Sequence, residues 1–82
     1  MLKIGDKVRI RSLEEIDRKP KGSWVNELFE NCICAIVNVR HVSGIPSKYI
    51  LRLEKETSKI RSTSCVPEIK FFAWEEDELE KL

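Results

Sequence analysis

Residues 32–42 read CICAIVNVRHV and are rich in β-branched side chains. This composition is typical of a β-strand. Because successive side chains of a strand point to opposite faces of a sheet, the run offers two sets of residues. We expect the core face to carry Ile33, Ala35, Val37 and Val39. The outer face would then carry Cys32, Cys34, Ile36, Asn38 and Arg40.

Two neighbouring segments have the pattern of strands that are buried on one face. Residues 7–11 (KVRIR) alternate strictly between polar and apolar side chains, as in an antiparallel sheet with one solvated face. Residues 49–53 (YILRL) follow a turn at 43–47, and we interpret them as the return strand. The inward side chains of the two strands are expected to be Val8, Ile10, Tyr49, Leu51 and Leu53.

The remaining segments predict one more strand and short helical turns. Residues 69–74 (IKFFAW) predict the strand, after which Leu79 is expected to return to the core. Ser12 and Glu15 have the spacing of a capping box, which predicts a helical turn over 13–17. Residues 24–29 predict a short helix in which Trp24 and Leu28 share a face. Asn31 then suits a left-handed turn.

The whole chain of 82 residues is interpreted as one domain with an insertion. Four to five short strands at close spacing favour a small all-β barrel over a βαβ arrangement. Residues 54–68 are mixed and polar, and a structureless loop of that length is unusual in so small a domain. We therefore expect an extended, twisted hairpin at about 54–68, a mobile loop being the alternative.

The order of these elements resembles that of small phage and mobile-element proteins, which are similar to the SH3-like repeats of Mind-bomb-type ubiquitin ligases. The elements that carry the resemblance are Gly5 to Arg11, Trp24-Val25, Ile33 to Val39, Tyr49 to Leu53, and Phe72-Ala73-Trp74 followed by Asp77 to Glu80. The resemblance implies an SH3-like barrel of about five antiparallel strands with one or two short helical turns. It also implies a phage or prophage origin. The glycine expected before the central strand is replaced by Asn31.

The net charge of the chain does not favour binding to an anionic partner such as a nucleic acid. The formal net charge is +1, with 41% hydrophobic and 35% charged residues. Basic residues gather before Gly22 and acidic residues after Trp74, and we expect the two ends to lie close and neutralise each other. The alternative is a dipolar docking surface. No run is long enough to span a membrane and no secretory signal opens the chain, so a cytoplasmic location, in a host cell if phage-encoded, is expected.

Catalytic and metal-binding signatures are weak. Cys32, Cys34, Cys65 and His41 could be combined into a zinc site, but their spacing is not that of a structural zinc motif. Reduced, partly buried thiols are the expected state, with a redox-sensitive thiol as the alternative. A Cys–His dyad has no surrounding signature, and no phosphate-binding loop is present. We therefore predict a non-enzymatic protein with no cofactor and no metal.

Aromatic residues exceed what so small a core needs, and basic residues gather in the connections. Adjacent Phe71 and Phe72 must point to opposite faces of a strand, so one of them is expected outside the core. The candidate contact residues are Arg18, Lys19, Lys21, Trp24, Lys59, Arg61, Phe71 and Phe72.

These residues predict a protein-binding module. A sharper form of this hypothesis, suggested by the resemblance, is a stoichiometric inhibitor of a host antiviral protein such as a CRISPR nuclease. One alternative is a nucleic-acid-binding domain. Its phosphate contacts would be Arg9, Arg11, Arg18, Lys19 and Lys21, and Trp24 would stack on a base. Another is a virion accessory protein that self-assembles through its edge strands.

Overall fold

The protein folds into one open, five-stranded antiparallel sheet with the strand order β4-β3-β2-β1-β5. The computed structural model describes residues 2–16 and 23–82. The elements are β1 (Lys7–Ile10), α1 (Ser23–Phe29), β2 (Ile33–Val42), β3 (Ile45–Lys55), α2 (Ser58–Ser62), β4 (Trp74–Glu75) and β5 (Leu79–Lys81), with 3-10 turns at Leu13–Glu15, Ile69–Phe71 and Glu76–Glu78. The fold class predicted from the sequence is confirmed: the described protein is mostly β, with five antiparallel strands, two short helices and 3-10 turns.

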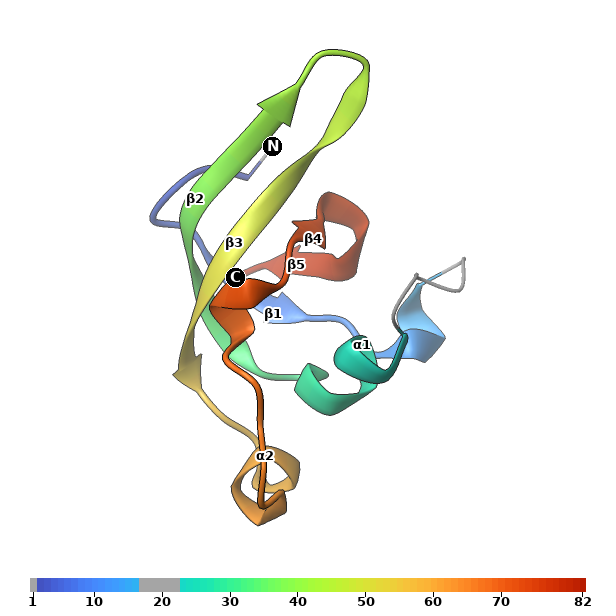
Figure 1. Ribbon diagram of the computed structural model, residues 1–82, viewed down its shortest axis with the longest axis vertical. Helices are drawn as coiled ribbons and strands as arrows, with labels where there is room; N and C mark the ends of the chain where they lie inside the picture. Colours follow the sequence, from blue (N-terminus) through green and yellow to red (C-terminus); the bar gives the residue numbers. More distant parts are fainter. Residues whose placement is uncertain (1, 17–22) are drawn as a thin grey trace.

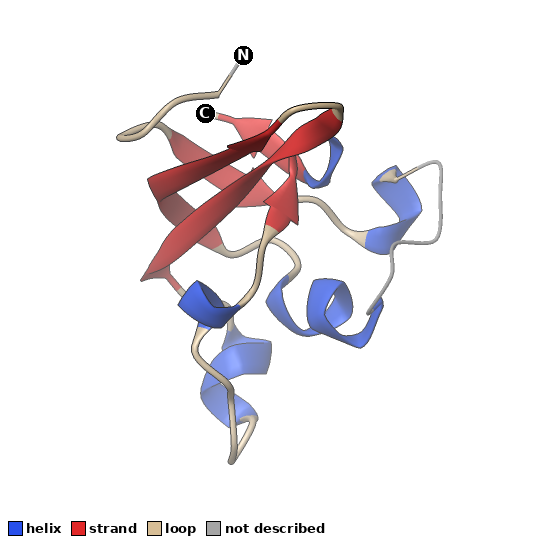
Figure 2. Ribbon diagram, turned by 45° about the horizontal axis from the view of Figure 1, so that its top comes forward, coloured by secondary structure: helices blue, strands red, loops and turns tan. Residues whose placement is uncertain are grey.

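The molecule is elongated, with principal extents of 39 × 26 × 22 Å. The β2–β3 hairpin projects at one end of the longest axis, and α2 lies at the other end (Figure 1). Helices α1 and α2 lie beside the sheet, away from the tip of that hairpin (Figures 1 and 2). The tip of the hairpin therefore extends beyond the rest of the sheet, whereas the other end is a mixed wall of sheet and helix.

The inward faces predicted for the first and third strands are confirmed. Val8 and Ile10 of β1 are fully buried, as is Leu51 of β3. Tyr49 is buried beside them, and Leu53 packs partly buried against the same core. Regular alternation in these two short segments was enough to identify their buried side chains.

The face predicted for the central strand is wrong over most of its length. Cys34 and Ile36 are buried, while Val37 is 41% exposed. Cys34 lies opposite Leu53 and Ile36 lies opposite Leu51, so both share the core face of β3. The next pairs are Asn38 with Ile50 and Val39 with Tyr49, so Val37 is an extra residue in β2. This β-bulge reverses the alternation, and Val39 again packs against the core.

Ala35 and Ile33 also differ from the expected core set. Ala35 is buried, but it does not belong to the core cluster. It pairs with Lys7 on one side and Arg52 on the other, so these long side chains flank it on the outer face. Ile33 is half-buried on that face.

The predicted hairpin at 54–68 and the predicted strand at 69–74 are also wrong. Residues 58–62 form α2, whose single apolar residue, Ile60, is buried in the core. Pro67 lacks an N–H donor, which disfavours a strand through this position. Residues 69–71 form a 3-10 turn, and the strand is reduced to Trp74–Glu75. Leu79 is buried, as predicted.

The two ends of the chain lie side by side, as expected from their opposite charges. β1 pairs with β5, and the Arg9 Nε is 3.0 Å from the Glu80 Oε1. Arg9 Nη2 is 2.9 Å from the Glu15 Oε2, and Arg9 Nη1 donates to the Asn31 Oδ1 at 2.8 Å. The hydrogen bonds that Arg9 donates to Glu80 and Glu15 raise the pKa of Arg9. Arg9 therefore connects β1, β5, the first 3-10 turn and the turn between α1 and β2.

A buried polar contact fastens α1 to the last 3-10 turn. The Asn26 amide is 2% exposed and donates a hydrogen bond to the Glu78 carboxylate, which is also buried. The other Glu78 oxygen accepts a hydrogen bond from the Glu75 N–H at 2.9 Å. A buried carboxylate requires such donors, because leaving it without them costs several kcal/mol.

Asn31 has a φ of 67° and ends the connection between α1 and β2 in the left-handed region. Its N–H donates to the Ile10 carbonyl at 2.8 Å, so the chain must turn at this point. We expect Asn31→Ala to lower the free energy of unfolding by about 1 kcal/mol relative to Asn31→Gly, because a Cβ without a local polar side chain is strained there. Urea unfolding of both variants measures the difference. Equal stabilities would contradict this account.

Candidate functional site

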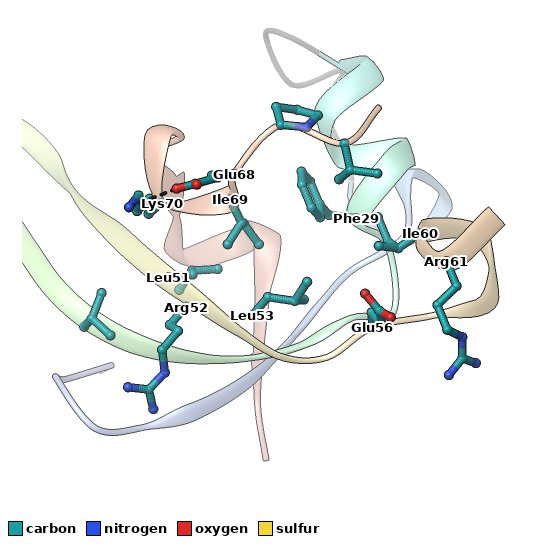
Figure 3. A pocket seen from close by; sticks show the side chains of 13 residues that line it. Phe29, Leu51, Arg52, Leu53, Glu56, Ile60, Arg61, Glu68, Ile69 and Lys70 are labelled. Atoms are coloured by element: carbon teal, nitrogen blue, oxygen red, sulfur yellow. Dashed lines mark ion pairs between the residues drawn. The ribbon is translucent and has the colours of Figure 1, made fainter. Parts of the chain in front are cut away.

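An open groove of about 750 Å³ lies between β3 and the segment 56–70, and its lining is largely apolar (Figure 3). Five parts of the chain supply apolar side chains: α1, β2, β3, α2 and the segment that leads into the second 3-10 turn. These residues are Phe29, Val37, Leu51, Leu53, Ile60, Val66, Pro67 and Ile69. A concave, largely apolar surface of this size is the usual form of a binding site.

Charged side chains surround this apolar surface. Lys70 Nζ is 2.9 Å from the Glu68 Oε2, and Arg52 Nη2 is 3.3 Å from the Glu54 Oε1. Arg61 lines the groove from α2 and forms no ion pair within residues 2–16 and 23–82. It is therefore a cation that the described part of the fold leaves available.

The wall that contains α2 is held in place by contacts with α1. Lys59 Nζ donates to the Glu27 carbonyl at 2.9 Å and lies 3.3 Å from the Glu30 Oε1. Ile60 anchors the same helix in the core. Because Ile60 is buried and Lys59 is bonded to α1, the backbone at Arg61 has a defined position beside the groove.

A series of aromatic rings leads from the surface into the core behind the groove. Trp24, 59% exposed, meets Phe72 edge-on with ring centroids 6.0 Å apart. Phe72 lies 6.2 Å from Phe29, which in turn lies 6.3 Å from Trp74. Phe71 points outward and is 75% exposed, with the Lys70 Nζ 5.6 Å from its ring centroid.

The structure brings together some of the contact residues predicted from sequence and separates others. Arg61 lines the groove, and Lys59 connects its wall to the Glu27 carbonyl of α1. Phe71 and Trp24 are exposed, while Phe72 is turned inward between Trp24 and Phe29. The predicted contacts Arg18, Lys19 and Lys21 lie outside the described residues.

The sequence reading missed the apolar floor of the groove. Ile60 stands between polar neighbours on both sides, a pattern that fits a single anchor better than a strand. Pro67 is the second missed signal, because proline is rare inside a strand. Together these two residues could have indicated that 54–68 is not a regular hairpin.

A second hollow, of about 700 Å³, lies beneath the β2–β3 hairpin and contains the only histidine of the sequence. The Ser47 Oγ and the His41 Nδ1 are 2.7 Å apart. Glu76 accepts a hydrogen bond from the Tyr49 hydroxyl at 3.3 Å and one from the Leu2 N–H at 3.4 Å. The carboxylate of this hollow is thus engaged away from the Ser–His pair, whereas a catalytic triad places it against the imidazole.

The cysteines are not arranged as a metal site. Cys32 and Cys34 are fully buried, whereas Cys65 is exposed. Within the described ranges, the one group of three potential ligands close enough to share an ion is Glu75, Asp77 and Glu78. Burial raises the pKa of the Cys34 thiol to about 12 and also raises that of Cys32.

Comparison of the chain with protein-family models, with curated proteins and with solved structures gave no match. The relationship to small phage proteins and Mind-bomb-type repeats stays a prediction. Residues 2–16 and 23–82 contain no helix that is both long enough and apolar enough to cross a lipid bilayer.

The different burial of the thiols predicts their reactivity. We expect iodoacetamide at mildly alkaline pH to modify Cys65 in the folded protein, because the thiolate is the reactive form and the Cys32 and Cys34 thiols are buried with raised pKa values. In guanidinium chloride all three cysteines should react. Mass spectrometry counts the adducts, and rapid labelling of Cys34 in the folded protein would contradict the structure.

Proposed function

We propose that this protein is a non-enzymatic protein-binding module whose binding site is the groove between β3 and the segment 56–70. The observation that supports this most strongly is the apolar lining, which comes from five separate parts of the chain and stays open between them. Burying such a surface in a partner is favourable by about 25 cal/mol per Å². The exposed Phe71 beside the groove residue Lys70 would extend the contact, since aromatic residues are frequent anchors in interfaces.

The charge arrangement favours this proposal over nucleic-acid binding. Arg9 is bonded to Glu15, Glu80 and Asn31, and Arg11 Nε donates to the Leu79 carbonyl at 3.2 Å. Lys7 is paired with Glu54. These β1 cations would have to give up internal partners before they could bind phosphates. The inhibition of a host antiviral protein, suggested by the resemblance, is a proposal about the outcome of such binding.

A pair of matched substitutions on β2 tests the site. Val37 lines the groove and Val42 lies near the tip of the hairpin, and both are exposed enough to accept a polar side chain. A phage-displayed library of random short peptides is selected on the wild-type protein, and the recovered peptides are measured against Val37→Asp and Val42→Asp. We expect Val37→Asp to weaken binding by about tenfold or more, since a charge in the apolar lining must be desolvated. Val42→Asp should leave it unchanged.

The two variants carry the same substitution on the same strand, so circular dichroism and thermal unfolding can show that both remain folded. The proposal fails if no peptide is enriched on the wild-type protein. It also fails if the enriched peptides bind folded Val37→Asp as tightly as the wild type.

A further inference from the structure

β3 has an unpaired edge over its last residues. On one side it pairs with β2 from Ile45 to Lys55. On the other side, within the described residues, it pairs with β4 through Lys48 and Tyr49 alone. Leu51 is fully buried and the 3-10 turn at Ile69–Phe71 packs against β3, so the part of this edge that stays open is residues 52–55, about 13 Å long at about 3.3 Å per residue. Such an edge is a template on which another extended chain can pair.

The groove runs along this same edge. Leu51, Arg52 and Leu53 all line it, although successive side chains of a strand point to opposite faces. A single groove can touch all three only if it passes along the side of the strand, and the side toward β2 is occupied. The opposite wall is formed by residues 66–70, and no backbone hydrogen bond of the described chain joins this wall to residues 52–55.

Cations outnumber acids in the chain around the end of the groove near α2, where Arg52, Glu56 and Arg61 line it. Residues 52–61 contain four cations, Arg52, Lys55, Lys59 and Arg61, but only two acids, Glu54 and Glu56. Lys59 is hydrogen-bonded to the Glu27 carbonyl of α1 and paired with Glu30. Arg52 and Lys7 both form ion pairs with Glu54. Arg61 is left without an ion pair in the described ranges, and it lines the groove. A partner with a carboxylate at this end would complement the charge.

We propose that the partner segment is an acidic peptide that binds as an added strand on the free edge of β3 and places a carboxylate beside Arg61. This inference rests on the proposed function and specifies the conformation and the chemistry of the ligand. Backbone hydrogen bonds to residues 52–55 supply affinity, and alternate apolar side chains of the peptide enter the groove. The carboxylate fixes the direction and register of the peptide.

Backbone methylation tests the conformation. Each residue of a peptide selected on the wild-type protein is replaced in turn by its N-methyl form, and binding is measured by calorimetry. We expect losses of about tenfold at every second residue and small changes between them, because an added strand turns alternate N–H groups toward β3. Losses repeating every three or four residues would indicate a helical ligand and overturn the inference, as would the absence of any periodicity.

A charge exchange tests the chemistry. Arg61→Glu is compared with Arg40→Glu, a matched change on the exposed part of the β2–β3 hairpin outside the groove. We expect the selected peptides to be acidic, Arg61→Glu to weaken their binding by about tenfold, and Arg40→Glu to have little effect. Replacing the responsible acid of the peptide by Lys should restore binding to Arg61→Glu. Raising the salt concentration should reduce the difference between wild type and Arg61→Glu.

The two proposals fail in different ways. If Val37→Asp abolishes peptide binding but methylation shows no two-residue period, the groove is the site and the added strand is wrong. If selection yields peptides without acids and Arg61→Glu binds them like the wild type, the proposed charge preference is wrong. A dimer in sedimentation that Val37→Asp dissociates would assign the groove to a second copy of the chain, and this result would overturn the inference.

Discussion

The extra residue at Val37 is the constraint on which the arrangement of β2 and β3 depends. A strand without it would place Ile36 and Val39 on opposite faces, since they are three residues apart. The bulge lets both pack against the core, opposite Leu51 and Tyr49 of β3. It also moves Val37 out of the core and into the lining of the groove. One inserted residue thus completes the hydrophobic core and shapes the surface proposed to bind a partner.

The same bulge explains which parts of the sheet could be predicted from sequence. The alternation in residues 7–10 and 49–53 gives the right face, because the side chains there follow a strict two-residue period. In β2 the bulge exchanges the inward and outward positions partway along an unbroken run of strand-forming residues. Nothing in the sequence of that run marks the position of the bulge. Only the pairing with Leu51 and Ile50 reveals that Val37 is the extra residue.

The site was less predictable than the fold because its parts are far apart in the chain. Phe29, Leu53 and Ile69 belong to separate elements that meet only in the folded protein. A single sequence suggests that Arg61 and Phe71 are exposed, but not that Arg61 is held by the neighbouring contact of Lys59 with α1. The attraction between the basic N-terminal part and the acidic C-terminal part was easier to predict. It requires only that β1 and β5 lie side by side, as the Arg9–Glu80 ion pair shows.

The buried hydrogen bond between Asn26 and Glu78 affects how the protein folds during its synthesis on the ribosome. Its two partners are 52 positions apart, and β1 must wait for Leu79–Lys81 to complete its pairing. A nascent chain therefore cannot fix α1, and with it the Phe29 wall of the groove, until these late residues have emerged. Such non-local closure is slow compared with local helix formation. Until then the apolar side chains of the strands are exposed and can aggregate with other newly made chains. Chaperone binding is therefore most useful to this protein in that interval.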